Sequence, residues 1–355
     1  MSFYPTMMDS QNLESQLDQI ADSYVSKRKN VTLAIGVIQQ DRHYIKEFGK
    51  LSDTQPSNLN AHTVYEIGSV TKVLTGTVLA ALINEKTVLL EDSIRLYLPA
   101  DVVSRLHLSI QSITLLQLVT HTSGLPRLPV SLLEAIADPA NPYSQYTAEK
   151  MYADLEQVKL LSEPGHHYEY SNFGMGLLGH LSSLKVSQPY EELVKNCICQ
   201  PLGMTDTTIR LTPEQRQRLT LGHSSDGTLA SNWSFDVMAP AGAFRSTVKD
   251  LLKFLQANLH KTDTQVAKAL ARSQERYFED NPLLHIGLAW HISTLWNGQV
   301  VYWHNGGTGG YVSFIGFDQE NQTGAVVLSN YGDAFANDAS VDEMGVRILI
   351  ELSSQ

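Results

Sequence analysis

The chain is poor in cysteine and has no basic clusters. Only two of its 355 residues are cysteines, Cys197 and Cys199, and their close spacing excludes a disulfide framework. Because they also lack histidines at metal-ligand spacing, the sequence predicts no metal site. The formal net charge is −11, and no block rich in lysine and arginine is present. Phosphate binding needs a basic face, so we expect no nucleic-acid partner.

Long apolar segments and an export signal are also missing. The longest apolar runs, residues 31–38 and 73–83, are too short to span a bilayer. Residues 1–15 contain neither the basic region nor the apolar core of a signal peptide. We therefore expect a cytoplasmic protein with no membrane partner. The sequence leaves the oligomeric state open.

Hydrophobic periodicity predicts strands at both ends of the chain and mostly helices between them. Apolar residues three or four positions apart predict helices over residues 9–27, 69–85, 114–121, 147–160, 173–185, 190–196, 247–258 and 338–352. Segments rich in β-branched and aromatic residues predict strands over residues 31–39, 43–49, 285–293, 299–304, 311–317 and 323–330. Residues 52–62 are rich in Asn, Pro and Ser and predict a loop.

This order of elements predicts an α+β fold. Strands need partners for their backbone groups, so the two chain ends should share one antiparallel sheet. The helices between them should form an all-helical lobe inserted into this α/β sandwich. We expect residues 1–65 and 261–355 to form the sheet domain and residues 66–260 the helical domain, with an active site in the cleft between them.

One of four Ser-x-x-Lys pairs has surroundings that suit catalysis, namely Ser69 with Lys72. The apolar run that follows predicts a buried helix, whose N-terminus would bring unpaired N–H groups close to the serine. Burial lowers the pKa of a lysine, so Lys72 could accept the serine proton. The alternative is that Ser69 only caps the helix. The other pairs, which begin at Ser26, Ser182 and Ser246, predict surface positions or a helix N-cap.

Two further segments carry groups that would complete such a site. Tyr170 and Asn172 precede a predicted apolar helix; a tyrosine beside a lysine can act as a base, and an asparagine can bind a substrate carbonyl and accept a hydrogen bond from Lys72. His304 ends a predicted strand, and Asn305, Gly306 and Gly307 follow it. Glycines let a backbone N–H approach an oxyanion closely. The alternatives are a core tyrosine and a glycine-rich turn.

In this order, the three segments resemble the serine β-lactamase and penicillin-binding-protein superfamily. The branch that they are most similar to contains class C β-lactamases, D-peptidases and β-lactamase-like esterases. Four more blocks share the resemblance, which extends over roughly residues 30–330: INEKTVLLEDSIRLYLP (83–99), LLQLVTHTSGLP (115–126), QPLGMTDT (200–207) and AGAFRSTVKDLLKFL (241–255). It implies a β-lactamase/transpeptidase-like fold.

The resemblance also implies a role for each residue. Ser69 would be the acylated nucleophile, and Lys72 would accept its proton. Tyr170 would activate the hydrolytic water or the leaving group, and Asn172 would position the substrate. The backbone N–H groups of Ser69 and Gly307 would form the oxyanion hole.

The chain departs from this family at His304, where many members carry the lysine of Lys-Thr-Gly or Lys-Ser-Gly. A histidine is mostly neutral at cytoplasmic pH and should attract a substrate carboxylate less. We therefore expect a cofactor-free serine hydrolase, in particular a carboxylesterase acting on small acyl esters. A D-amino-acid peptidase or amidase, a β-lactamase, an acyltransferase and a catalytically silent binding protein are the alternatives.

Substrate choice should depend on two long loops, residues 126–146 and 222–240, which are predicted to border the cleft. The expected partner is a small ester, amide or D-peptide. We predict that His121 is a structural hydrogen-bonding residue in the turn that Gly124 and Pro126 fix.

Overall fold

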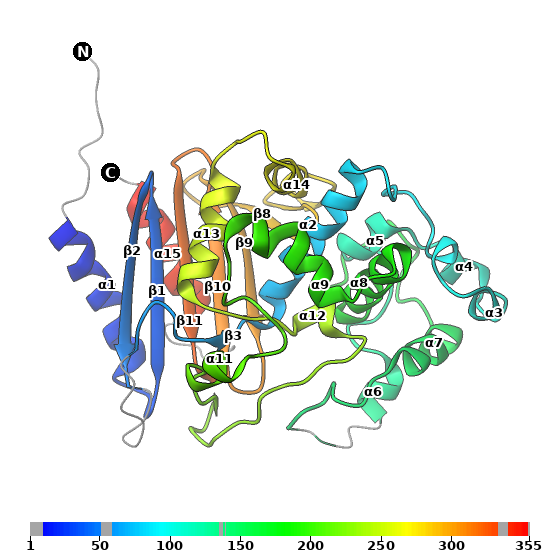
Figure 1. Cartoon of the computed structure of the whole chain (residues 1–355). Helices are drawn as coiled ribbons and strands as arrows, with labels where there is room; N and C mark the ends of the chain where they lie inside the picture. Colours follow the sequence, from blue (N-terminus) through cyan, green and yellow to red (C-terminus); the bar gives the residue numbers. More distant parts are fainter. Residues whose placement is uncertain (1–9, 51–58, 135–137, 139, 333–339, 354–355) are drawn as a thin grey trace, which may run out of the picture.

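An eight-stranded antiparallel sheet, built from both ends of the chain, forms one half of the molecule (Figure 1). The computed structural model describes residues 10–50, 59–134, 138, 140–332 and 340–353. The sheet order is β2-β1-β11-β10-β9-β8-β7-β6. Its strands are β1 (Thr32–Gln39), β2 (Arg42–Gly49), β6 (Phe278–Asn281), β7 (Leu284–Ile286), β8 (His291–Thr294), β9 (Val300–Gly307), β10 (Val312–Asp318) and β11 (Thr323–Ser329).

The N-terminal hairpin joins the C-terminal strands through β1 and β11. These strands pair antiparallel, with Leu33 opposite Ser329 and Gln39 opposite Thr323. The β1 residues are almost all buried, as expected for a strand that is covered on both faces. The α+β class and the predicted sheet built from both chain ends are therefore confirmed.

Helices cover both faces of the sheet. On one face, α1 (Ser10–Val25) packs against β1 and β2, and α15 (Val341–Ser353) packs against β10 and β11. The core on this face includes the alternate β1 residues Leu33, Ile35 and Val37. On the other face, α13 (Val248–Leu259) packs against β1, β10 and β11. Since side chains alternate along a strand, the two faces have separate apolar cores.

The second half of the molecule consists mainly of helices around α2 (Thr71–Asn84), which is apolar on all sides and almost wholly buried. Its neighbours α8, α9, α12 and α14 come from distant parts of the chain. The bounds of the other helices in this region are α3 (Ala100–Val103), α4 (Leu108–Gln111), α5 (Leu115–Val119), α6 (Val130–Glu134), α7 (Ala148–Gln157), α8 (Asn172–Val186), α9 (Tyr190–Val194), α10 (Gln200–Leu202), α11 (Pro213–Gln217), α12 (Ala239–Gly242) and α14 (Gln265–Ser273).

The remaining described elements are two 3₁₀ helices, one π-helix and two pairs of short strands. The 3₁₀ helices are η1 (Gly68–Val70) and η2 (Ile94–Leu96), and the π-helix is η3 (Lys195–Cys199). The strand pairs are β3 (Tyr65–Glu66) with β5 (Arg245–Ser246), and β4 (His223–Ser224) with β12 (Tyr331–Gly332). No helix within the described ranges is both long and apolar enough to cross a membrane.

The sequence prediction misplaces one strand and omits several elements. The strand predicted over 285–293 is wrong, because the chain turns back between β7 and β8; Gly287 N–H donates to the Trp290 carbonyl at 2.8 Å, and Ala289 has a φ of 71°. Helix α14 and the edge strand β6 were not predicted. Most of the predicted loop at 52–62 lies outside the described residues. The domain limits remain a prediction, and α13, which we assigned to the helical domain, packs on the sheet.

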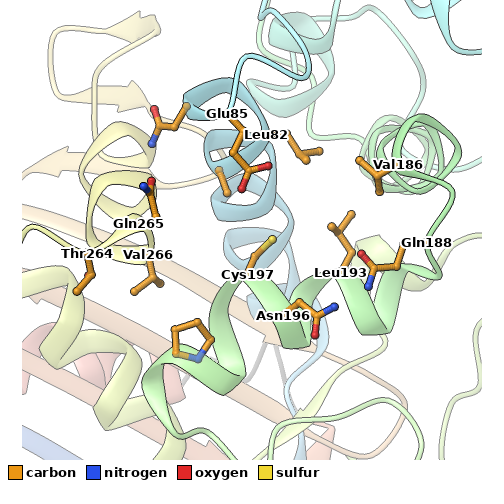
Figure 2. A pocket seen from close by; sticks show the side chains of 13 residues that line it. Leu82, Glu85, Val186, Gln188, Leu193, Asn196, Cys197, Thr264, Gln265 and Val266 are labelled. Atoms are coloured by element: carbon orange, nitrogen blue, oxygen red, sulfur yellow. The ribbon is translucent and has the colours of Figure 1, made fainter.

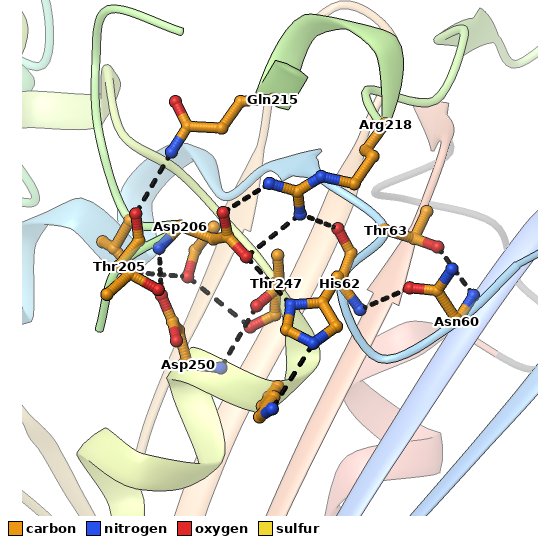
Figure 3. A network of polar contacts seen from close by, with 12 residues as sticks. Asn60, His62, Thr63, Thr205, Asp206, Gln215, Arg218, Thr247 and Asp250 are labelled. Carbon is orange, nitrogen blue, oxygen red and sulfur yellow. Dashed lines mark hydrogen bonds and ion pairs between the residues drawn. The ribbon is translucent and has the colours of Figure 1, made fainter. Parts of the chain in front are cut away.

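A polar network fastens the segment before β3 to α11 and α13 (Figure 3). Its centre is Asp206, which accepts hydrogen bonds from both terminal nitrogens of Arg218, at 2.5 and 3.0 Å, and contacts His62 Nδ1 at 3.1 Å. The Asp206 N–H donates to Asp250 of α13 at 2.7 Å. This network therefore holds the chain a few residues before Ser69.

Candidate active site

Ser69 lies in the 3₁₀ turn η1, which leads directly into the buried helix α2. The end of β9 packs closely against this turn. Gly68 has a φ of 47°, and a Cβ added there would lie 2.6 Å from Gly307 N. A Cβ added at Gly306 would lie 2.1 Å from the Ile67 carbonyl oxygen and 2.9 Å from Ser69 N. Glycine is needed on both sides of this contact, which brings the backbones at Ser69 and Gly307 together.

Lys72 lies one helical turn after Ser69, and its amine reaches the serine hydroxyl. Lys72 Nζ is 2.8 Å from Ser69 Oγ. The same amine donates to the Ala241 carbonyl oxygen of α12 at 2.6 Å. The predicted pairing of this serine with this lysine is thus present as a direct hydrogen bond.

The surroundings of Lys72 favour its neutral form. The side chain is completely buried. Burial, and to a smaller degree the positive charge of Arg127, lower the pKa of Lys72 well below its usual value. An uncharged amine has a lone pair that can accept the proton of Ser69, so the pair can generate a nucleophile.

Tyr170 completes the contact around the amine, but its hydroxyl group stays protonated. Lys72 Nζ lies 4.9 Å from the centre of the Tyr170 ring, and the phenol interacts with the Ser69 side chain. Burial raises the pKa of Tyr170 above its usual value, and the effects of Ser69 and Arg127 that lower it are smaller. Burial therefore opposes the loss of the Tyr170 proton that a role as a base requires, and a neutral Lys72 supplies no cation to stabilise a phenolate.

His121 and Ser171 hold Tyr170 in place. The His121 ring packs on the Tyr170 ring with 4.5 Å between centroids, and its Nδ1 accepts a hydrogen bond from Ser171 N–H at 3.1 Å. Ser171 caps α8 by accepting from Gly174 N–H at 2.9 Å. His121 acts as the structural hydrogen-bonding residue that the sequence predicted, and it also supports the Tyr170 ring.

Asn172 begins α8 close to Tyr170, yet it does not contact Lys72. Its Nδ2 donates to the Tyr143 hydroxyl at 3.2 Å. Its Oδ1 is buried without a hydrogen-bond partner among the described residues. The predicted hydrogen bond from Lys72 to Asn172 is absent within the described part of the chain, because the amine is already shared between Ser69 and Ala241.

His304 lies on β9 beside this group and is fully buried. Its ring centroid is 6.3 Å from that of Tyr170. Nδ1 contacts the Asn305 carbonyl oxygen at 2.6 Å and must donate to it, so Nε2 carries the lone pair in the neutral ring. Burial, with help from His291 and Lys72, lowers the pKa of His304 well below its usual value. The neutral histidine that the sequence predicted is supported by these surroundings.

Asn305 points away from Ser69. Its Nδ2 donates to Asp342 of α15 at 2.6 Å, on the opposite face of the sheet from His304. Neighbouring residues of a strand face opposite sides, so His304 and Asn305 cannot both face the same site. The assignment of the Asn305 side chain to substrate binding is therefore corrected, whereas the backbone at Gly306 and Gly307 does reach Ser69.

Aromatic residues from the two predicted specificity loops meet next to Asn172. Tyr143 stacks on Phe235 with 4.7 Å between ring centroids, and Trp233 lies 5.5 Å from Tyr143. The sequence did not single out Tyr143 or Phe235. Trp290 is buried in the core.

The three other Ser-x-x-Lys pairs have structural surroundings. Ser182 Oγ donates to the Leu178 carbonyl within α8. Ser246 contacts Thr207 Oγ1 at 2.8 Å, and the N-cap of α13 is Thr247, one residue later than predicted. Ser26 follows the last turn of α1.

A cavity of about 430 Å³ lies away from Ser69, at the C-terminal end of α2 (Figure 2). Its lining is mixed, with Leu82 and Val266 beside the polar Glu85 and Asn196. Cys197 of the π-helix also lines it as a free thiol, and burial raises the pKa of this thiol to about 11. A protonated thiol is a poor nucleophile, so Cys197 is a weaker candidate for the reactive group than Ser69.

Comparison with known proteins identifies the family. The family model described as Beta-lactamase matches residues 17–343. The chain belongs to the Beta-lactamase family. Among curated relatives, the D-alanyl-D-alanine-carboxypeptidase/endopeptidase AmpH of Escherichia coli strain K12 is 26% identical over 328 residues, which cover 88% of this chain and 82% of the relative. A Beta-lactamase of Pseudomonas fluorescens is 24% identical over 283 residues, or 79% of this chain and 75% of that protein.

Solved structures of this Beta-lactamase family share the fold. A class C beta lactamase superposes with a TM-score of 0.83 at 20% identity, over 97% of this chain and 99% of that one. The D-alanine carboxypeptidase AmpC from Burkholderia cenocepacia gives a TM-score of 0.81 at 23% identity, over 97% and 100%. The chain is therefore a β-lactamase-like serine hydrolase with the class C β-lactamase fold.

Proposed function

We propose that this serine hydrolase is a carboxylesterase that cleaves small acyl esters through a covalent intermediate on Ser69. The 2.8 Å contact between Lys72 Nζ and Ser69 Oγ carries the proposal. The neutral amine takes the hydroxyl proton as Oγ bonds to the ester carbonyl carbon. The resulting oxyanion would lie against the N–H groups of Ser69 and Gly307, and such a donor is typically worth about 3 to 4 kcal/mol in the transition state.

Breakdown of the tetrahedral intermediate needs a proton for the leaving oxygen. Lys72 holds the proton taken from Ser69, and Tyr170 lies beside it as a phenol. Lys72 can pass its proton to the departing alkoxide, which leaves as an alcohol. Where Tyr170 donates instead, the proton on Lys72 returns to the Tyr170 phenolate, so that Lys72 is neutral after either route. In the second half of the reaction, Lys72, neutral again, would remove a proton from water as the water oxygen attacks the acyl carbon. The acid is then released and Ser69 regains its proton.

The preference for esters rests on His304. A lysine at this strand position would present a permanent cation to a β-lactam carboxylate, whereas burial lowers the pKa of His304 and favours its neutral form. Esters also carry better leaving groups than amides. Their cleavage therefore depends less on a proton from Lys72 or Tyr170. The cytoplasmic location expected from the sequence would suit the same role and remains a prediction.

Cleavage of D-alanyl peptides is the second candidate. The protonated Tyr170 favours it, because an amine leaving group must receive a proton before it departs. The relative AmpH, named as a D-alanyl-D-alanine-carboxypeptidase/endopeptidase, supports the same reading.

Reaction with an active-site probe tests the shared mechanism. A fluorophosphonate should label the wild-type protein on Ser69, as identified by mass spectrometry, and Ser69→Ala should abolish labelling. Ser182→Ala is the matched control, because Ser182 also precedes a lysine by three positions but bonds within α8. Labelling on another side chain, or none in the wild type, would contradict the mechanism and favour a silent binding protein.

Substrate turnover then separates the candidates. The esterase predicts that kcat/KM for p-nitrophenyl butyrate exceeds that for nitrocefin and for D-alanyl p-nitroanilide. Faster release of p-nitroaniline from the D-alanyl anilide would favour the peptidase. Faster opening of nitrocefin would favour a β-lactamase and overturn the argument from His304.

A further inference from the structure

Ser313 lies on β10, on the same face of the sheet as His304. The strands β9 and β10 pair with Ser313 opposite Gly306 and Ile315 opposite His304. Paired residues of neighbouring strands point their side chains to the same face, so Ser313 faces the side on which Ser69 lies. Both strands pack against the η1 turn that carries Ser69. Ser313 therefore belongs to the part of the sheet surface that meets the nucleophile.

The Ser313 hydroxyl is bonded directly to the chain just ahead of Ser69. Its Oγ donates a hydrogen bond to the Ile67 carbonyl oxygen at 2.8 Å, across 246 positions of the sequence. The same carbonyl accepts a hydrogen bond from Val70 N–H at 3.1 Å, which closes the tight turn around Ser69. Ser313 is buried, and a buried hydroxyl without a partner is costly. One side chain of the sheet thus holds the carbonyl on which the turn is built.

Gly306 leaves the space in which this bond forms. A Cβ added there would lie 2.5 Å from Ser313 Oγ, and the same Cβ would meet the Ile67 carbonyl and Ser69 N. The hydroxyl, the carbonyl and the Ser69 amide are thus gathered around the Cα atom of one glycine. Removal of the hydroxyl would take a donor from the Ile67 carbonyl and leave a small gap beside it. The turn could then shift relative to β10.

We propose that Ser313 is a positioning residue for the nucleophile, which fixes the Ser69 turn against the sheet. The inference rests on the proposed acyl-enzyme mechanism, in which Ser69 supplies both the attacking oxygen and one N–H of the oxyanion hole. Ser313 acts through the Ile67 carbonyl and not on the substrate. An oxyanion develops only on the way to the tetrahedral intermediate, so a displaced turn should lower kcat more than it raises KM.

A purely structural role is the competing explanation, because a buried hydrogen bond also stabilises the fold. Ser182 provides the matched control: it is buried too, and its Oγ donates to the Leu178 carbonyl within α8 at 2.9 Å. Loss of either hydroxyl should lower the urea concentration at which half of the protein is unfolded. Only the loss of the Ser313 hydroxyl should slow the reaction of protein that is still folded.

The test measures turnover of p-nitrophenyl butyrate at a temperature at which circular dichroism shows every variant to be folded. Ser313→Ala should lower kcat by about tenfold to a hundredfold, as expected when a small displacement disturbs an oxyanion-hole donor, and should leave KM within about twofold. Ser182→Ala should keep the wild-type kcat. If Ser313→Ala does not fold, Ser313→Cys replaces it, because a thiol fills the space but is a weak donor; the same losses are expected.

Two further readouts report on the tetrahedral geometry at Ser69. Propylboronic acid adds to a serine as a tetrahedral anion that resembles the butyryl intermediate. Its inhibition constant should therefore rise in Ser313→Ala by a factor similar to the loss of kcat/KM, and should not change in Ser182→Ala. The rate of labelling by the fluorophosphonate should fall over the same range, and this rate needs no ester substrate.

The outcomes separate the role of Ser313 from the proposed function. Wild-type kcat and labelling rate in the Ser313 variant, or an equal loss of kcat in Ser182→Ala, would overturn the role of Ser313 and leave the esterase intact. A wild type that is labelled on Ser69 but cleaves no ester would contradict the esterase, and the labelling rates would still decide on Ser313. No labelling of the wild type would contradict the acyl-enzyme mechanism and, with it, this role.

Discussion

Lys72 Nζ donates a hydrogen bond to the carbonyl oxygen of Ala241 at 2.6 Å, and this contact fixes the direction of the amine. One N–H is committed to α12, so the lone pair of a neutral amine can face Ser69 Oγ at 2.8 Å. The backbone of helix α12 therefore helps to orient the amine of Lys72, although none of its side chains needs to react.

Replacing the amine should remove most of the activity. Lys72→Met keeps the length of the buried side chain but cannot accept a proton, so kcat/KM for p-nitrophenyl butyrate should fall by about 10²- to 10⁴-fold, the usual contribution of a general base. The fold should persist, because an apolar side chain suits the buried position. Steady-state kinetics and thermal unfolding measure the two effects. Lys185→Met changes the exposed lysine of another Ser-x-x-Lys pair and should leave activity intact; equal losses in both variants would contradict the assignment.

The pH dependence of the reaction should follow Lys72. The neutral amine is the active form, so activity should fall as the pH drops through the pKa of Lys72 and the amine becomes protonated. Arg127→Gln removes a positive charge that helps to lower this pKa, so the acidic limb of the kcat/KM profile should move to higher pH. Burial is the larger cause and remains, so a lowered pKa should persist. The position of this acidic limb is measured from the pH profile of kcat/KM for p-nitrophenyl butyrate, which carries no charge. A shift to lower pH, or the same shift in Arg216→Gln at an exposed arginine of α11, would reject this explanation.

The sequence predicted the parts of this protein that local patterns encode. The β1–β2 hairpin, the buried helix after Ser69 and the polar residues before α8 are visible as periodicity and as motifs. The β7–β8 hairpin was missed because Gly287 to Trp290 reads as a continuous apolar segment, and its turn uses Ala289 at a positive φ.

Contacts between distant segments were harder to predict. Arg127 lies close to the Tyr170 ring because its own carbonyl oxygen accepts hydrogen bonds from the first residues of α8. This contact joins two distant segments, so no local sequence pattern predicts it. The proton on Tyr170 depends on how deeply the ring is buried and on a neutral Lys72, which are both tertiary properties. The direction of Asn305, in contrast, could have been derived from the alternation of side chains along β9.

Adding a single methyl group at Gly306 should disturb the nucleophile. A Cβ there would lie 2.1 Å from the Ile67 carbonyl oxygen and 2.9 Å from Ser69 N, and both atoms belong to the backbone. Gly306→Ala should therefore push the Ser69 turn away from β9, with a loss of stability of about 1 to 3 kcal/mol and a larger loss of activity. Urea unfolding and ester turnover measure these effects. Gly324→Ala is the control, because its Cβ would meet side chains only at 3.4 Å or more. Unchanged activity in Gly306→Ala would show that the contact does not position Ser69.

The network around Asp206 should make stability depend on pH in the acidic range (Figure 3). Burial acts to raise the pKa of Asp206, but hydrogen bonds from Arg218 and His62 prevail and lower it to about 2. A carboxyl whose folded pKa is depressed contributes stability above its unfolded pKa, near 3.9, and loses that contribution as the pH falls toward the folded value. Asp206→Asn should thus reduce the free energy of unfolding at neutral pH by about 1 to 3 kcal/mol, since Arg218 loses its charged partner. The difference from the wild type should shrink below about pH 4.

Urea titrations at a series of pH values measure this difference in the free energy of unfolding. Asp263→Asn, at an exposed ion pair, is the control and should show no change. A difference that is constant down to the lowest pH would mean that Asp206 stabilises the fold without its charge.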